Sequence, residues 1–347
     1  MKKYFSTKAT GTAIRMRIFI SALCVFSAGI AQADMAEYFK GKTITLIISS
    51  RSGSSVDLVG RTIAPMLAKA LDAKVIPKNM SAAGGMEGLN FVATRAKPDG
   101  LTIGMRDSSS CFLNQMMKAP GAQWDISTLK YIANIQPGSM VLYVTPGGKI
   151  KTIADLRAAK GLKFSSVSPR GWMTSVIAGT IDVLKLDAKL VSGFKGSAAA
   201  ALAVSKGEAN ASAVEGYTLQ RYDRKGQALP LFSTRAKKDP AYPALPVITD
   251  IVDVPKDSVA LFMAGIASGK LMVLPPGTPD DKVAYLADVT WKIINGGAFK
   301  SEFLKRVGTN VWNENVTGAD FAKQAREMLA KKTLGKQMLA ILEKYRP

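Results

Sequence analysis

The chain has 347 residues and a formal net charge of +21, with 47 Lys or Arg against 26 Asp or Glu. It contains no histidine, so histidine-based acid–base catalysis, histidine triads and histidine metal sites are excluded. The basic residues are dispersed and no nucleic-acid-binding motif accompanies them, so the charge favours small anionic partners and argues against nucleic acid.

The first 33 residues have the pattern of a secretory signal peptide. Basic residues precede an apolar run at 18–30, and Ala31-Gln32-Ala33 provides a small-residue cleavage site. A membrane anchor is the alternative, but the run is shorter than the ~18 to 20 residues that cross a bilayer. We therefore expect a periplasmic product that begins near Asp34 and does not span a membrane, with Met16 as an alternative start.

Removal of this segment changes both the charge and the thiol count. The segment carries five basic and no acidic residues, so its loss would lower the net charge from +21 to +16. It also contains Cys24, which leaves Cys111 as the only thiol and rules out an internal disulfide. Stability must then come from hydrophobic cores, and about 310 residues are enough for two lobes.

The first elements after the signal alternate between strand and helix. The run TITLIIS at 43–49 predicts a buried parallel strand, and the apolar spacing at 56–71 predicts a helix that Pro65 should kink or restart. A strand at 74–79, a helix after Gly85 and a strand at 101–105 follow. This β-α-β-α-β series indicates a parallel sheet with right-handed crossovers.

A second α/β series begins at residue 140. Its expected strands are 140–145, 162–168, 188–192 and 209–214, with helices at 173–184 and 197–206 and a helix cap formed by Thr152 and Asp155. Thr278-Pro279-Asp280-Asp281 then opens a helical tail, which we expect to pack back on the first lobe. The predicted division is therefore 34–138 and 231–347 for the first lobe, and 139–230 for the second.

Polar loops follow the strands of the first lobe, where ligands bind in open α/β sheets. The hydroxyl-rich loop at 49–57 runs into a helix N-terminus that suits an anion, although a plain capped turn with Asp57 as a first-turn acid is the alternative. The loop at 82–85 lets backbone approach a ligand closely or is simply structural. The loop at 106–110 is serine-rich, and its alternative is a surface pair between Arg106 and Asp107.

The loops of the second lobe have the same character. Arg170, in the loop at 165–171, is placed to form a bidentate contact with a carboxylate, and the alternative is a solvated side chain. Lys195 and Glu215 each follow a strand. Tyr217 either contacts the ligand or packs between the lobes.

The expected ligand contacts share a position just after a strand. They are Ser50, Arg51, Ser54, Ser55, Asp57, Ala83, Gly84, Gly85, Ser108, Ser166, Ser168, Arg170, Gly171, Thr174, Lys195, Glu215 and Tyr217.

None of these groups forms a catalytic constellation. A nucleophilic serine needs a base, which without histidine leaves only a lysine or a carboxylate, and Cys111 lacks a histidine partner. Walker, dinucleotide-binding and EF-hand motifs are absent from the sequence, so we expect no catalytic residue, metal or cofactor. An exported hydrolase that uses a Ser/Lys pair is the alternative from another class.

Several short motifs follow one another in an order that resembles one known family. They are the strand at 42–48, Asp57-Leu58-Val59-Gly60-Arg61, Ala64-Pro65-Met66-Leu67, Ala82-Ala83-Gly84-Gly85, the turn and strand at 97–104, Gly193-Phe194-Lys195-Gly196 and the segment at 274–279. Together they resemble the Bug-type receptors of tripartite tricarboxylate transporters over nearly the whole mature chain.

The resemblance implies a type II periplasmic binding fold with two lobes, each a mostly parallel sheet flanked by helices. It also implies a monomer that closes on a small carboxylate without catalysis and passes it to membrane permease subunits. In relatives, the loops that correspond to Ser50–Asp57, Ala83–Gly85 and Ser166–Thr174 hold the carboxylate, partly through backbone amides and bridging waters. A receptor of another uptake or sensing system would share this pattern.

The chain departs from the family pattern at two points. Ser49-Ser50-Arg51 stands where relatives usually have Pro-Phe, and the aspartate that relatives have near Asn210 is missing. Arg51 together with Arg170 favours a solute with two or more negative charges.

Overall fold

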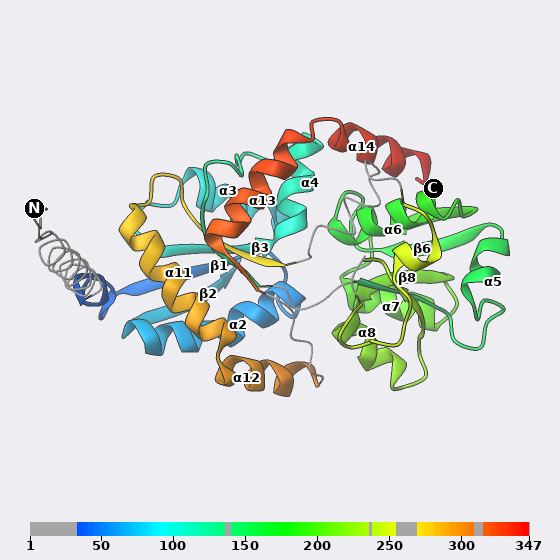
Figure 1. Cartoon of the computed structure of the whole chain (residues 1–347), viewed down its shortest axis with the longest axis horizontal. Coiled ribbons are helices and arrows are strands. Elements are labelled where there is room, and N and C mark those ends of the chain that lie inside the picture. The colour runs from blue at the N-terminus through cyan, green and yellow to red at the C-terminus, as the bar shows by residue number, and fades with distance from the viewer. Residues whose placement is uncertain (1–32, 136–139, 236–237, 255–268, 309–314, 347) are drawn as a thin grey trace, which may run out of the picture.

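Two lobes lie side by side along the long axis of the molecule, each built around its own sheet (Figure 1). This computed structural model describes residues 33–135, 140–235, 238–254, 269–308 and 315–346. The expected signal peptide falls on residues 1–32, apart from its last residue, and so lies outside the described residues. Within the described ranges, no helix is long and apolar enough to cross a membrane.

A six-stranded mixed sheet forms the first lobe. Its strands, in spatial order, are β11 (Val316–Thr317), β4 (Lys130–Ile135), β10 (Lys270–Leu274), β3 (Thr102–Asp107), β1 (Thr43–Ile48) and β2 (Lys74–Asn79). β1 pairs in parallel with β2 and β3, as the β-α-β-α-β pattern predicts. β10 is antiparallel to β3 and β4, and β11 is antiparallel to β4, so the parallel part covers half of the sheet.

Helices cover both faces of this sheet. They are α2 (Ser55–Leu71), α3 (Ala82–Thr94), α4 (Ser108–Met116), α11 (Asp280–Asn295), α12 (Gly297–Val307) and α13 (Gly318–Ala330). α2 buries Val59, Ile63 and Leu67 in the first core, on the apolar face that the sequence predicts. The predicted restart at Pro65 is wrong, because α2 continues through it as one helix. Packing on both sides of Pro65 outweighs the loss of its one backbone hydrogen bond.

A five-stranded mixed sheet forms the second lobe. Its strands, in spatial order, are β7 (Ala188–Ser192), β6 (Leu162–Ser166), β8 (Ala211–Glu215), β5 (Met140–Val144) and β9 (Leu229–Ser233). β6 is parallel to β7 and β8, whereas β5 is antiparallel to β8 and β9. The accompanying helices are α5 (Ile153–Ala158), α6 (Trp172–Val183), α7 (Ser197–Ser205), α8 (Gly216–Asp223), α9 (Ile248–Ile251) and α14 (Leu334–Lys344). The predicted capping box of Thr152 and Asp155 begins α5.

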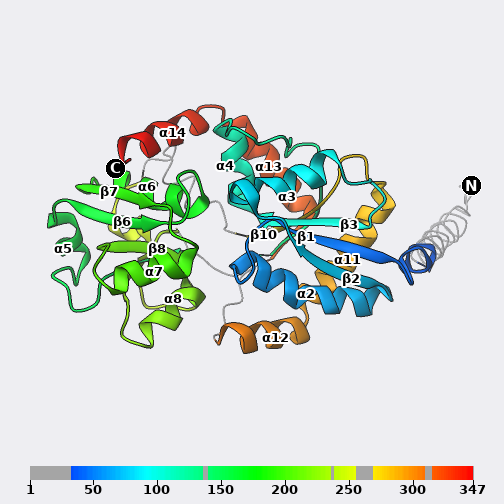
Figure 2. The ribbon, with the colours of Figure 1, turned by 180° about the vertical axis from the view of Figure 1, so that it is seen from behind.

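The segment after residue 230 contributes to both lobes. β9 completes the second sheet and Ile248 of α9 lies in the second core. α14 packs on α6 and buries Leu334, Met338 and Leu342 in that same core, and it lies at the boundary between the lobes in both views (Figure 1, Figure 2). This differs from the expected return of the whole tail to the first lobe, because chain order does not reveal which core an amphipathic helix will cover.

The predicted α/β fold with two lobes is confirmed, but the sheets are mixed rather than mostly parallel, because β10 and β11 run antiparallel to their neighbours in the first sheet and β5 does so in the second. The carboxyl ends of β1, β2 and β3 lead into the segments of the first lobe that the sequence marks as candidate binding segments. Glu215 at the end of β8 contacts the first of these segments through Ser55.

Candidate functional site

The loop after β1, the start of α3 after β2 and the end of β3 meet at one edge of the first sheet. β3 runs directly into α4 at Ser108, so the predicted loop at 106–110 is a strand end and a helix start instead. The amide nitrogen of Asn79 donates to the carbonyl oxygen of Ser50 at 3.0 Å, and Arg106 Nη2 donates to the carbonyl oxygen of Gly84 at 3.2 Å. Gly85 has a φ of +85°, and a Cβ placed there would overlap the carbonyl oxygen of Ser49. Only glycine fits this position, so the close approach of the two loops depends on it.

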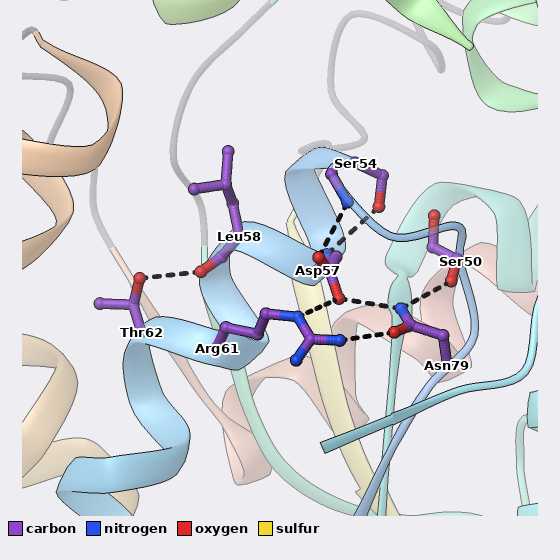
Figure 3. Close-up of polar contacts among 8 residues, drawn as sticks. Ser50, Ser54, Asp57, Leu58, Arg61, Thr62 and Asn79 are labelled. Atoms are coloured by element: carbon purple, nitrogen blue, oxygen red, sulfur yellow. Dashed lines mark hydrogen bonds and ion pairs between the residues drawn. The ribbon is translucent and has the colours of Figure 1, made fainter. Parts of the chain in front are cut away.

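Asp57 organises the loop after β1 from within the first turn of α2 (Figure 3). Its Oδ2 accepts from the backbone N–H of Gly53 at 2.9 Å, and its Oδ1 accepts from Arg61 Nε at 2.9 Å and Asn79 Nδ2 at 2.8 Å. Ser54 caps the helix by accepting from the backbone N–H of Asp57 at 3.2 Å. These contacts favour the alternative weighed from the sequence, a first-turn acid that orders the loop, and its predicted ligand contact stays a prediction.

The other predicted residues of these two loops lie near the surface. Arg51, Ala83 and Gly84 are exposed, and Ser50, Ser54 and Ser55 are half-buried. Ala83, Gly84 and Gly85 all have left-handed backbone angles, with φ of 51°, 67° and 85°, which interrupt the start of α3. A non-glycine residue is disfavoured in this region, so Ala83 is held there by its surroundings.

Arg106 is a buried residue that the candidate set omitted. Its side chain is 4 % exposed, and its guanidinium carbon lies 5.4 Å from the centroid of the Trp124 ring. Nη2 bonds to Gly84, whereas Nε and Nη1 have no hydrogen-bond partner among the described residues. Burial lowers the pKa of this guanidinium, opposed by the nearby Cys111 and Asp107.

The predicted surface pair between Arg106 and Asp107 is wrong. Arg106 is buried, and Asp107 Oδ2 lies 3.4 Å from Nζ of Lys270 instead. Adjacent residues on a strand point to opposite faces, so two neighbours on β3 do not face each other. That alternation, together with the buried character of β3, is the signal that could have revealed Arg106 from the sequence.

A buried ion cluster joins the two lobes beside these loops. Lys270, at the start of β10, is fully buried, and its Nζ also lies 3.4 Å from Oε1 of Glu215 at the end of β8. Ser55 Oγ donates to the same carboxylate oxygen at 3.0 Å. Burial opposes the charge on Lys270, but Glu215 and Asp107 outweigh that effect and raise the pKa of its ammonium group. Glu215 and Ser55, both predicted site residues, therefore meet across the lobe boundary.

Tyr217 follows two residues after Glu215, in the first turn of α8. It is 1 % exposed and its ring packs edge-on against Phe303 of α12, with centroids 5.9 Å apart. This contact between the lobes agrees with the packing alternative for Tyr217, and its ligand contact stays a prediction.

Four other predicted residues of the second lobe lie close together in the chain, between β6 and the first turn of α6. They are Ser168, Arg170, Gly171 and Thr174. Thr174 Oγ1 and the backbone N–H of Gly171 both donate to the carbonyl oxygen of Ser168. Arg170 is exposed and lines a hollow of about 160 Å³ with Leu342 and Arg346 at the C-terminal end of the chain. Within the described residues, no hydrogen bond links the loop at 166–174 to the loops of the first lobe.

Three further predicted residues differ in burial. Ser166 is buried, and its Oγ has no hydrogen-bond partner among the described residues. Ser108 is buried at the start of α4, where its backbone N–H donates to the carbonyl oxygen of Gly269 at 2.9 Å. Lys195 is exposed.

The chemistry of the described part offers binding groups rather than a nucleophile. Cys111 is fully buried, and burial raises the pKa of its thiol to about 12, so it stays protonated near neutral pH. In the described ranges, no group of three or more His, Cys, Asp or Glu side chains is placed to hold a metal ion.

Comparison with known proteins identifies the family. Residues 59–338 match the model of the tripartite tricarboxylate transporter family receptor. The chain belongs to this family. The resemblance seen in the sequence is thereby confirmed, and the members of this family are solute-binding receptors rather than enzymes.

Individual relatives agree with this family. The protein BugT of Bordetella pertussis is 21 % identical over 272 residues, which cover 77 % of this chain and 80 % of that protein. Solved structures of MatC from Rhodopseudomonas palustris with bound malate and of Rpa4515 from R. palustris with adipate share the fold. Their TM-scores are 0.69 and 0.70 at 17 % and 19 % identity, and they cover 85 % and 86 % of this receptor and 99 % and 97 % of their own chains.

Proposed function

We propose that this receptor is a periplasmic solute-binding protein that captures a small carboxylate and delivers it to a tripartite tricarboxylate-type permease. One observation carries the proposal: the loop after β1, the start of α3 and the end of β3 meet beside the N-terminus of α2, at the boundary with the second lobe. Backbone N–H groups and the dipole at a helix N-terminus favour an anion, and the serine hydroxyls of the loop add directed donors. The net charge of the chain favours the same class of solute.

The known ligands of similar structures support a carboxylate. Malate and adipate, bound in two proteins of the same fold, are both small dicarboxylates. Identity below 20 % leaves the side chains around the ligand free to differ, so the choice of acid must come from this chain's own residues.

The proposed mechanism is closure of the two lobes on the solute. A ligand that contacts both lobes only in the closed state shifts the population toward closure by its difference in affinity between the two states. Contacts of the lobes outside the ligand site would set the starting equilibrium. Besides the cluster around Lys270, Arg221 and Arg224 of α8 donate to the carbonyl oxygens of Arg306 and Gly308 at the end of α12, each at 3.1 Å.

Thermal melting of the purified mature protein against mono-, di- and tricarboxylates tests this function. A specific ligand at about 100 times its dissociation constant should add about 2.7 kcal/mol of stability, which raises the melting temperature by several degrees. Inorganic phosphate and matched neutral amides of the same acids serve as controls. A panel in which no carboxylate raises the melting temperature more than its amide would overturn the proposal.

Delivery to a permease has its own test. Deletion of the gene should abolish uptake of the acid that stabilises the protein, and the mature receptor supplied in trans should restore uptake. A deletion that alters transcription but leaves uptake intact would instead indicate a sensing role.

A further inference from the structure

The segment from Ala82 to Gly88 covers two buried polar side chains that the fold leaves unpaired. Nε and Nη1 of Arg106 and Oγ of Ser49 have no hydrogen-bond partner among the described residues, and both residues are 4 % exposed. A Cβ at Gly85 would lie 3.0 Å from Arg106 Nη1, and a Cβ at Gly88 would lie 2.5 Å from Ser49 Oγ. The two unpaired side chains therefore lie beneath the same short stretch of chain.

The guanidinium of Arg106 lacks a hydrogen-bonded anion among the described residues. Its described contacts are one neutral carbonyl and the face of Trp124, and a buried charge is costly without a partner of opposite charge. No ion pair joins Arg106 to a carboxylate among the described residues, and the adjacent Asp107 pairs with Lys270. A hydroxyl donor, Ser49, completes a set of groups that suits a carboxylate.

The cover over Arg106 is thin and strained. Gly84, whose carbonyl accepts from Arg106, is exposed, and it is the second of three successive left-handed residues. Ala83 adopts this conformation against its own preference, so a shift of the 83–85 backbone that returned Ala83 to an ordinary conformation would relieve strain and would expose the guanidinium.

We propose that Arg106, assisted by Ser49, pairs with a second carboxylate of the solute and thereby makes this receptor selective for dicarboxylates. The inference rests on the proposed function, in which the first carboxylate lies at the loop before α2. Arg106 then acts as a specificity-determining residue, because an acid with one carboxylate leaves the guanidinium unpaired.

Matched pairs of acids test this directly. Adipate and hexanoate, and succinate and butyrate, have equal chain lengths and differ by one carboxylate. Calorimetric titration of the mature wild-type protein should give at least one pair in which the diacid binds about 10- to 100-fold more tightly than the monoacid. Arg106→Met should remove that preference and change monoacid binding by less than about threefold, and Arg106→Lys should retain part of it.

Two further variants keep the test decisive. Arg95→Met removes the same charge from the exposed far end of α3 and should leave the diacid preference unchanged. Ser49→Ala deletes a hydroxyl that has no described partner, so it should fold normally and weaken diacid binding by about three- to tenfold, even if Arg106→Met fails to fold.

The outcomes separate this inference from the proposed function. If the wild-type receptor binds carboxylates, and the Arg106→Lys and Ser49→Ala variants keep the full diacid preference, the role of Arg106 alone is overturned. Arg106 is then a structural residue that stacks on Trp124 and ties down Gly84. A wild-type receptor that binds no acid of either pair, or any other carboxylate, overturns the proposed function as well.

Discussion

The two lobes contribute to the lobe boundary in different ways. The first lobe presents buried charged groups that are fixed by strands and by each other: Asp57 in its loop network, Arg106 beneath α3, and Lys270 at the start of β10. The second lobe presents exposed charges, Arg170 and Lys195, and makes its buried polar contact through Glu215.

Under the proposed mechanism, this difference predicts which half recognises the solute before closure. Groups that are already fixed bind without a further loss of side-chain freedom, so the first lobe would receive the anion and the second lobe would close on it. The cluster around Lys270 is a buried charged connection between the two halves in this conformation, beside the contacts of α8 with α12. Variants that disturb each half separately therefore break or sharpen the comparison.

Removal of the buried ammonium group should have the largest effect. Lys270→Met leaves Asp107 and Glu215 near each other without their shared cation, across the boundary between the lobes. We expect a loss of about 3 to 5 kcal/mol in the free energy of unfolding, because one partner of a buried ion cluster is removed while the opposite charges remain. Urea unfolding followed by circular dichroism measures it.

A surface lysine provides the control for this variant. Nζ of Lys130 lies 2.7 Å from Oδ1 of Asp280, whose side chain is 90 % exposed. Lys130→Met should therefore lower the free energy of unfolding by less than about 1 kcal/mol. Adding Glu215→Gln to Lys270→Met should recover part of the stability, since it removes one of the two stranded carboxylates. Equal stability of the Lys270→Met and Lys130→Met variants would show that the cluster does not hold the lobes together.

Truncation of Asp57 should have an intermediate effect confined to the first lobe. Asp57→Ala leaves Gly53, Arg61 and Asn79 without their shared acceptor, so we expect a loss of about 1 to 3 kcal/mol in stability together with weaker ligand binding. Asp281→Ala, which removes an exposed first-turn acid from α11, should change stability by less than about 0.5 kcal/mol. Unchanged stability of Asp57→Ala combined with lost binding would instead make this carboxylate a direct ligand contact.

The parts of the fold that the sequence predicts well are those set by local spacing. The strands at Lys74–Asn79 and Ala188–Ser192 have the predicted bounds, and the capping box of Thr152 and Asp155 is present. Each of these features depends on residues within a few positions of one another, which is the range over which side-chain periodicity and capping act.

The features that the sequence did not reveal depend on distant partners. Lys270 is 163 residues from Asp107 and 55 from Glu215, so nothing near it in the chain marks it as a buried charge. The sequence suggested a pair between Arg106 and its neighbour Asp107, whereas the guanidinium donates to the carbonyl oxygen of Gly84, which is 22 residues away. The α14 pattern predicts an apolar face, but either core could have covered it. Candidate loops are therefore readable from one sequence, whereas the charges that define a site within them require the fold.

The exposed arginines should have the smallest effects, and Arg170 tests whether the second lobe recognises charge at all. Arg51 and Arg170 are both exposed, and Arg170 lies against the end of the chain near Arg346. In this conformation they act on an anion through long-range attraction, which salt screens over about 10 Å at 0.1 M. Arg51→Ala and Arg170→Ala should therefore each weaken carboxylate binding by about two- to threefold at low salt and leave the ligand-free melting temperature nearly unchanged.

Salt dependence separates this attraction from direct contact. The dissociation constants of both variants and of the wild-type protein are measured at about 50 mM and at about 500 mM NaCl. At the higher concentration the values of the variants should equal the wild-type value, because salt screens an attraction that has no buried component. A loss above about tenfold for Arg170→Ala that persists at high salt would contradict this expectation. It would mean that the loop at 166–174 closes directly onto the solute, so that the guanidinium of the second lobe binds the anion as the first lobe does.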